Sequence, residues 1–178
     1  MGIFLKDINL KGKTALITGA TKGLGRGAAI AIAEAGGNII AVGRNQSELN
    51  TLKKDIKKLK VNYISFNCDV NNYSRMKSFI SKQKKLDILV NNAGTNMPES
   101  FLNVKKSSLE TLLNVNTKAV FNVAQLCANQ IIKLKRKGGS IINISSIFGL
   151  VAGQKRTVYS MTKFGVEGLT KGMALDLA

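Results

Sequence analysis

Short apolar runs alternate along the chain with segments in which apolar residues recur at helical spacing. Strands that are apolar on both faces and alternate with helices are typical of a parallel sheet covered by helices on both sides. The pattern therefore predicts a doubly wound α/β fold. No linker, repeat or low-complexity segment interrupts it, so residues 1–178 are expected to form one domain. The predicted strands are Lys13–Gly19, Asn38–Gly43, Val61–Phe66, Leu86–Asn91 and Ser140–Ser145.

Helices are expected between these strands. Asn45 is a predicted helix cap, with Glu48 at capping-box spacing. Gly138 and Gly139 should end the longest helix. The predicted helices are Gly23–Ala35, the one capped by Asn45, a short one from Asn71 or Asn72 to Ile80, one from about Ser107 to Lys135, and one from near Thr157.

The residues with the most chemical promise fall where the predicted strands end. TGATKGLG (18–25) follows the first strand, Asp69 follows the third, NNAG (91–94) follows the fourth, and Ser145 with Ser146 follows the fifth. The carboxyl ends of parallel strands meet at one edge of a sheet, where ligands bind. The sequence therefore predicts one ligand site at this edge.

The glycine-rich segment has the spacing GxxxGxG rather than GxGxxG. Gly19 suits a tight turn, while Gly23 and Gly25 would let the backbone approach a pyrophosphate and let the helix pack close to the sheet. The free N–H groups at the start of a helix favour an anion. An ordinary glycine-rich turn is the alternative, but the position between a strand and a helix favours phosphate binding.

Tyr159 and Lys163 stand four residues apart in YSMTK, with Ser146 thirteen residues upstream. This spacing places two side chains on one face of a helix, one turn apart. A cation beside a phenol favours the phenolate, which would allow proton exchange with a substrate oxygen near neutral pH. An isolated pair of this kind more often lies on a solvated helix face, so the interpretation depends on the other motifs.

TGATKGLG, NNAG, the interval from Ser146 to Tyr159, and YSMTK together resemble the short-chain dehydrogenase/reductase family, from Lys13 to the last residue. The resemblance implies a Rossmann-like sheet with strand order 3-2-1-4-5, from which the last two strands of the family are absent. It therefore implies a fragment of a longer chain whose full-length form is a homo-oligomer. Poor solubility or poor activity is expected of these residues alone.

The resemblance also implies roles for single residues. Tyr159 would be the acid–base group, Lys163 would assist it and bond the nicotinamide ribose, and Ser146 would bond the substrate oxygen. Asn116 would hold a water in a proton relay with Lys163, and Asp69 would contact the adenine. The implied cofactor-binding residues are Gly19, Thr21, Lys22, Gly23, Leu24, Gly25, Arg44, Asp69, Val70, Asn92, Ala93, Gly94, Tyr159 and Lys163.

Without the resemblance, plainer interpretations of three of these residues stay open. Ser146 could be a turn residue, Asn116 a polar residue that bends its helix, and Asp69 a cap of the next helix.

The end of the second strand favours one nicotinamide cofactor over the other. An acidic residue there usually bonds the 2′-hydroxyl of NAD, whereas an Arg accommodates the 2′-phosphate of NADP. Arg44 occupies this position, and Lys22 lies in the glycine-rich segment. NADP(H) is therefore favoured, with NAD(H) as the alternative. Two exposed cations in a Lys-rich chain are the plainer interpretation.

Composition excludes several other chemistries. The chain has no His, which removes Ser-His-Asp catalysis and most zinc sites. Its ten carboxylates are scattered, so no metal site is expected. Cys68 and Cys127 are expected to be buried and reduced. The N-terminus lacks the apolar core of a signal peptide, and no run could span a membrane, so a cytoplasmic location is expected.

The net charge is +17, and Lys accounts for 22 of the 27 basic residues. Nucleic-acid readers favour Arg, and single-strand binders interleave aromatic residues. Neither feature is present, so no nucleic-acid partner is expected, and the Lys runs are interpreted as solvated helix ends. The runs are Lys53, Lys54, Lys57, Lys58 and Lys60; Lys82, Lys84 and Lys85; and Lys133, Lys135, Arg136 and Lys137.

These observations together favour an oxidoreductase that transfers a hydride between NADP(H) and the carbonyl or hydroxyl group of a small molecule. Thr95, Asn96 and residues 147–156 should lie near the reacting oxygen. Family members of similar appearance act on 3-oxoacyl thioesters, sugars and sugar acids such as gluconates. A nucleotide-binding protein or fragment without turnover is the main alternative, and a basic nucleic-acid binder is the third.

Overall fold

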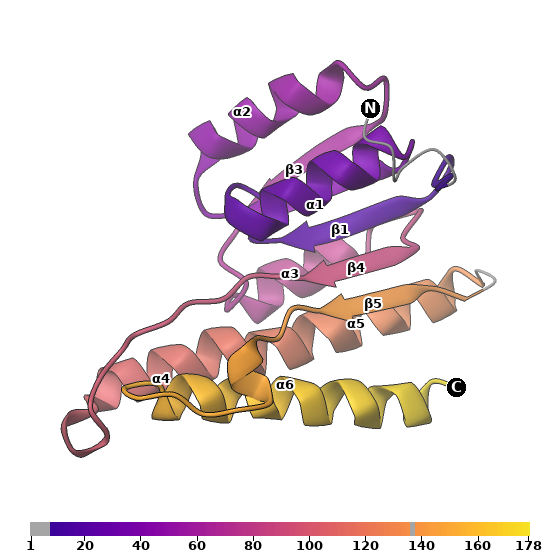
Figure 1. Ribbon diagram of the computed structural model, residues 1–178. Helices are drawn as coiled ribbons and strands as arrows, with labels where there is room; N and C mark the ends of the chain where they lie inside the picture. The colour runs from indigo at the N-terminus through magenta and orange to yellow at the C-terminus, as the bar shows by residue number, and fades with distance from the viewer. Residues whose placement is uncertain (1–7, 136–137) are drawn as a thin grey trace.

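The computed structural model describes residues 8–135 and 138–178, and its centre is a parallel five-stranded sheet. The sheet has the order β3-β2-β1-β4-β5, and every adjacent pair is parallel. This confirms the predicted fold class and strand order (Figure 1). The strands are β1 (Thr14–Thr18), β2 (Asn38–Gly43), β3 (Tyr63–Asn67), β4 (Ile88–Asn91) and β5 (Ser140–Asn143).

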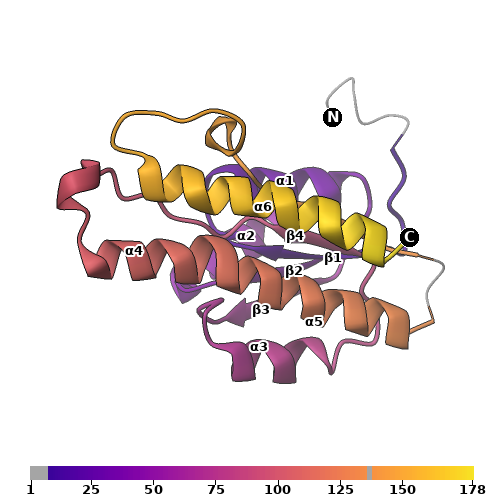
Figure 2. The ribbon, with the colours of Figure 1, turned by 90° about the horizontal axis from the view of Figure 1, so that it is seen from below.

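Helices cover both faces of the sheet. Helices α1 and α2 lie on one face, and helices α3 and α5 lie on the other. Helix α6 runs along the β5 side of the sheet, next to α4 and α5 (Figures 1 and 2). Chain direction accounts for this arrangement, because right-handed crossovers that run in opposite directions along a sheet place their helices on opposite faces. The helices are α1 (Gly23–Glu34), α2 (Gln46–Lys57), α3 (Tyr73–Ile80), α4 (Lys106–Leu113), α5 (Ala119–Lys133) and α6 (Thr157–Asp176).

The central strands bury side chains on both faces, as their apolar runs predict. On β1, Leu16 belongs to the core beneath α3 and α5, while Ala15 and Ile17 belong to the core beneath α1 and α2. All three are fully buried. Alternation along one strand therefore supplies both cores.

Most element boundaries differ from the expectations by one or two residues; for example, β3 begins at Tyr63 rather than Val61 and β4 at Ile88 rather than Leu86. Two further differences bear on the site. The fifth strand ends at Asn143 rather than Ser145, because β4, which lies beside it in the described sheet, ends at Asn91, the residue that pairs with Asn143. The long helix expected from Ser107 to Lys135 is interrupted by a π-helical turn over Asn114–Lys118, between α4 and α5. Single π-helical turns of this kind are frequent at functional sites.

Some expectations concern parts of the chain that are not described. Residues 1–7, which entered the localisation argument, and Arg136 and Lys137 of the third Lys run lie outside the described residues. Within residues 8–135 and 138–178, no helix has the length and apolar character needed to cross a membrane. The same part of the chain has no cluster of acidic, Cys or His side chains suited to a metal ion.

Candidate active site

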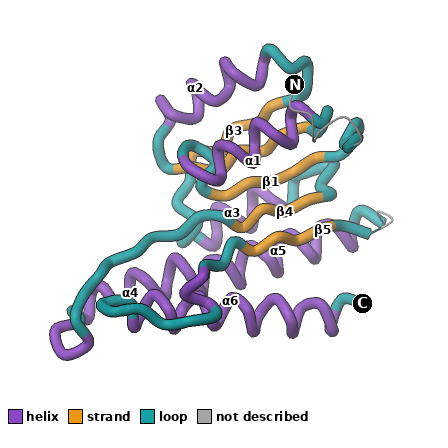
Figure 3. Tube along the Cα trace, viewed as in Figure 1, coloured by secondary structure: helices purple, strands orange, loops and turns teal. Residues whose placement is uncertain are grey.

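A pocket of about 670 Å³ lies at the carboxyl ends of the strands. Figure 3 shows two long loops at this end of the sheet, one from β4 to α4 and one leading into α6. The backbone N–H of Glu99 in the first loop donates to the carbonyl oxygen of Lys155 in the second, at 3.1 Å. Most predicted site residues line the pocket, namely Gly19, Thr21, Lys22, Leu24, Arg44, Asp69, Val70, Asn92, Ala93, Gly94, Tyr159 and Lys163.

Four predicted residues do not line it directly. Gly23 and Gly25 lie at the start of α1, Asn116 is buried beneath the loop after β4, and Ser146 begins the turn after β5. The pocket also contains residues that the motifs did not indicate, including Glu48, Thr111 and Val115. Thr111 and Val115 precede Asn116 in the sequence and lie one helical turn apart. This spacing could have predicted that both side chains face the pocket.

The glycine-rich loop is tied to the NNAG segment. The hydroxyl of Thr18 accepts the backbone N–H groups of Asn92 and Ala93, both at 3.0 Å. The side-chain amide of Asn92 donates to the carbonyl oxygens of Thr18 and Gly19, at 3.0 and 3.1 Å. These bonds join the ends of β1 and β4 into one rigid rim of the pocket.

This contact explains one of the two glycines at the start of α1. A Cβ atom on Gly25 would lie 2.3 Å from the Asn92 side-chain nitrogen and 2.3 Å from the Gly19 carbonyl oxygen. Gly23 has a positive φ of 54°, and a Cβ there would meet nothing within 4 Å. Gly25 is therefore required for packing, whereas Gly23 leaves open backbone beside the pocket.

Substitution of Gly25 by Ala should lower stability by about 3 kcal/mol, because the new methyl group overlaps backbone that cannot move aside. Gly27 provides a matched control in the same helix, since a Cβ there meets nothing within 4 Å. Gly27→Ala should instead raise stability by about 0.5–1 kcal/mol through helix propensity. Urea unfolding measures both changes, and equal stability of the two variants would contradict the packing argument.

Tyr159 and Lys163 share one face of α6, as their spacing predicts. The Lys163 ammonium lies 5.7 Å from the centroid of the Tyr159 ring and donates to the Ile144 carbonyl oxygen at 2.8 Å. Lys163 is only 5% exposed. This burial lowers the pKa of Lys163, because desolvation disfavours the charged form. A cation is thus held inside the pocket beside a phenol.

Ser146 is connected to Tyr159 through Phe148. The Ser146 hydroxyl oxygen accepts the backbone N–H of Phe148 at 3.2 Å and caps a 3₁₀ turn over Ile147–Gly149. The Phe148 ring meets the Tyr159 ring edge to face, with centroids 6.2 Å apart. Because the Ser146 oxygen only accepts in this turn, its own proton can still be donated to a ligand.

Asn116 lies in the π-helical turn, and its side chain is fully buried. Its oxygen accepts the Thr95 N–H at 2.9 Å, and its nitrogen donates to the Thr95 carbonyl at 2.8 Å and to the Thr162 hydroxyl at 3.3 Å. Both amide protons are thereby used. The side chain fastens the loop after β4 to α6, next to Lys163.

The opposite end of the pocket is polar and carries both signs of charge. Arg44 lies 3.7 Å from Asp69, and Lys22 lies 3.6 Å from Glu48. Asp69 also accepts the Asn71 N–H at 2.9 Å, but the cap of α3 is Asn72. Asp69 is therefore not the cap of the following helix, and its carboxylate faces the pocket.

A family model for short chain dehydrogenases matches residues 13–178. The chain belongs to the short-chain dehydrogenase family. It is 34% identical over 175 residues to the 3-oxoacyl-[acyl-carrier-protein] reductase FabG of Thermotoga maritima, an alignment that covers 96% of this chain and 70% of that protein.

Two solved structures illustrate the likeness in fold. The carveol dehydrogenase of Mycobacterium avium in complex with NAD has a TM-score of 0.89 and 26% identity, covering 95% of this chain and 67% of that one. A candidate 2-deoxy-D-gluconate 3-dehydrogenase of Agrobacterium tumefaciens with bound NADP has a TM-score of 0.88 and 29% identity, covering 96% and 68%.

Membership in the short-chain dehydrogenase family establishes the class of reaction. The chain is an NAD(P)-dependent oxidoreductase that acts on CH–OH groups of small molecules. The described residues fit a dinucleotide. The first turn of α1 has no side-chain cap, so its N–H groups are available to a phosphate. Open backbone at Gly23 and the pocket volume leave room for the rest of the cofactor.

Proposed function

We propose that the chain transfers a hydride between NADP(H) and the carbonyl or secondary hydroxyl group of its substrate, with Ser146, Tyr159, Lys163 and Asn116 as the catalytic set. The observation that carries this proposal is the buried Lys163 ammonium beside the Tyr159 ring, in a pocket that also contains the glycine-rich loop. The nicotinamide, when bound, supplies or accepts the hydride.

Reduction of a carbonyl group builds negative charge on its oxygen. Tyr159 donates its hydroxyl proton to that oxygen, and Ser146 stabilises the developing charge by a hydrogen bond. Lys163 favours the phenolate that remains on Tyr159, because opposite charges attract in a partly dehydrated site. Alcohol oxidation reverses the proton transfer.

Asn116 supports this set in the proposal. Its amide holds Thr95, a pocket residue, and the Thr162 hydroxyl, which in turn donates to the Tyr159 carbonyl oxygen at 2.7 Å. The loop after β4 and the first turns of α6 therefore keep a fixed separation. A proton relay through a water near Asn116 and Lys163 stays part of the proposal, with the water held by groups other than the two amide protons.

The substrate is proposed to be a 3-oxoacyl thioester, a sugar or a sugar acid. Two of the relatives named above carry a 3-oxoacyl thioester and a sugar acid in their names, and Thr95, Asn96 and Thr111 line the same pocket as Tyr159. Absorbance at the nicotinamide band with a panel of these compounds tests the proposal. Cofactor binding without any absorbance change across the panel would favour a nucleotide-binding protein without turnover.

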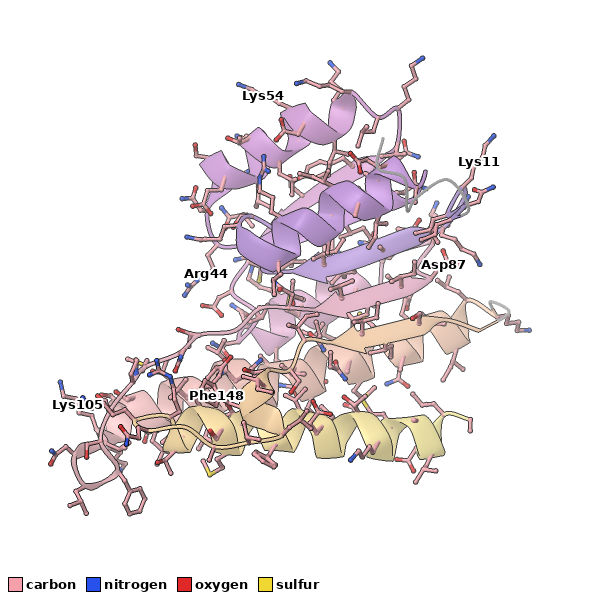
Figure 4. All side chains as sticks on the ribbon, viewed as in Figure 1. Lys11, Arg44, Lys54, Asp87, Lys105 and Phe148 are labelled. Carbon is pink, nitrogen blue, oxygen red and sulfur yellow. The ribbon has the colours of Figure 1, made fainter. Side chains whose placement is uncertain are left out.

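NADP(H) is the proposed cofactor, and Arg44 provides the test. Its side chain is 79% exposed at the end of β2, where it can meet a 2′-phosphate (Figure 4). Arg44→Ala should weaken NADP binding about tenfold and leave NAD binding unchanged, because only NADP carries the phosphate. Titration calorimetry measures both.

Lys54→Ala removes a cation from the exposed surface of α2 and serves as the control, with no change expected for either cofactor. The NADP assignment is wrong if the wild-type chain binds NAD as tightly as NADP and Arg44→Ala alters neither affinity.

A further inference from the structure

Each cation at the proposed 2′-phosphate end of the pocket already has an anionic neighbour. Lys22 lies 3.6 Å from the Glu48 carboxylate, and Arg44 lies 3.7 Å from the Asp69 carboxylate. All four side chains line the pocket. Two positive and two negative charges sum to zero, so this end of the pocket is less favourable to an anion than its Lys and Arg alone would indicate.

Glu48 is held in place by the first turn of α2. Its backbone N–H donates to the Asn45 side-chain oxygen at 3.1 Å. The next residue, Leu49, donates its own N–H to the Asn45 carbonyl and is fully buried. The backbone of Glu48 is therefore fixed at the helix start, which keeps its carboxylate within reach of Lys22.

The glycine-rich loop lies against this helix start, which brings Lys22 to Glu48. The backbone N–H of Ala20 donates to the Val42 carbonyl oxygen at 3.1 Å. A Cβ on Gly43 would lie 2.7 Å from the Thr21 methyl carbon, so the loop and the end of β2 are in close contact. Lys22 follows directly, and its side chain is 81% exposed while that of Glu48 is 35% exposed.

We propose that Glu48 is a specificity-determining residue of the cofactor site, whose carboxylate neutralises Lys22 and weakens the binding of a 2′-phosphate relative to a 2′-hydroxyl. The proposal rests on the proposed NADP site and adds a residue that opposes it. A 2′-phosphate must compete with Glu48 for Lys22 and is repelled by the carboxylate, whereas a 2′-hydroxyl meets neither penalty.

Asp69 is less suited than Glu48 to a test of this effect. Its carboxylate also accepts the Asn71 N–H, so removing its charge would disturb the turn before α3 as well as Arg44. Glu48 occupies the third position of its helix, where Glu and Gln are both favourable. Glu48→Gln therefore removes the charge and leaves the helix start intact.

The test measures Glu48→Gln with adenosine 2′,5′-bisphosphate and with AMP, which differ only in the 2′-phosphate. Glu48→Gln should bind the bisphosphate about two- to fivefold more tightly, the range expected from an exposed ion pair, and should bind AMP unchanged. The gain should shrink in high salt. Glu34→Gln, the same change at the exposed end of α1 on the opposite edge of the sheet, should alter neither affinity.

The outcomes separate this inference from the NADP assignment. Unchanged bisphosphate affinity in Glu48→Gln, together with a loss in Arg44→Ala, would show that Glu48 has no such effect while the phosphate site stands. Weaker AMP binding in Glu48→Gln would show that Glu48 accepts a ribose hydroxyl instead, which overturns the inference. If neither Arg44→Ala nor Lys22→Ala weakens bisphosphate binding, the phosphate site and the inference are both wrong.

Discussion

Tyr159→Phe should lower turnover by about 10²–10⁴-fold and change cofactor affinity far less. The phenolic hydroxyl is the only group that this substitution removes, and general acid–base catalysis contributes an effect of that size. The ring should stay in place, because its contacts with Phe148 and with the Lys163 ammonium do not need the hydroxyl. Single-turnover absorbance with saturating cofactor and calorimetric titration measure the two quantities separately.

Tyr73→Phe is the matched control. Tyr73 is 40% exposed at the start of α3, and the same change there should have no effect on rate. Turnover of Tyr159→Phe at the wild-type rate would remove Tyr159 from the mechanism. A parallel loss of cofactor affinity would instead indicate that the hydroxyl mainly positions the ligand.

The motifs predicted the positions of side chains well where those positions depend on spacing along one element. Tyr159 and Lys163 lie on one helix, so their separation in sequence fixes their separation in space. The glycine-rich loop, NNAG and Ser146 follow consecutive or neighbouring strands, and the parallel sheet brings those strand ends to one edge. Local pattern and topology together were sufficient for these residues.

Contacts between distant segments could not be predicted in this way. Asn92 packs on Gly25, and Asn116 bonds both Thr95 and Thr162, although no periodic pattern relates these positions. Glu48 was recognised only as part of a capping box. Its position beside Lys22 follows from how closely β2 approaches the glycine-rich loop, which depends on packing of the folded chain.

The proposed catalytic set uses a buried charge, which creates a tension between function and stability. Within the described residues, Lys163 is the one buried lysine, whereas Lys171 on the same helix is exposed. Burial of an ammonium group is unfavourable unless partners compensate for the lost hydration. The Ile144 carbonyl is one such partner, and the proposed role of Lys163 explains why the remaining cost is tolerated.

Lys163→Met should therefore lower turnover by about 10²–10⁴-fold and raise the stability of the cofactor-free protein near neutral pH. The apolar side chain has a similar length and removes the desolvation cost, at the loss of one hydrogen bond to Ile144. Lys171→Met is the control on the same helix, where neither change is expected because the ammonium there is already in water.

The pH dependence of stability gives the sharper test of this substitution. Burial holds the pKa of Lys163 below its ordinary value. At pH values between that lowered pKa and the pKa of ~10.4 of a lysine in the unfolded chain, the unfolded chain binds more protons than the folded one. The free energy of unfolding therefore rises with pH across this range. Below the lowered pKa, the folded protein is destabilised by the full free energy of burying a charged ammonium group. The stability advantage of Lys163→Met over wild type should consequently be largest near pH 7 and narrow towards about pH 10.

Urea unfolding across this range measures the difference in stability between the two proteins, in which the titration of all other groups cancels. A difference in stability that does not vary with pH, or a wild type that is the more stable protein at every pH, would show that burial of the charged Lys163 does not destabilise the fold.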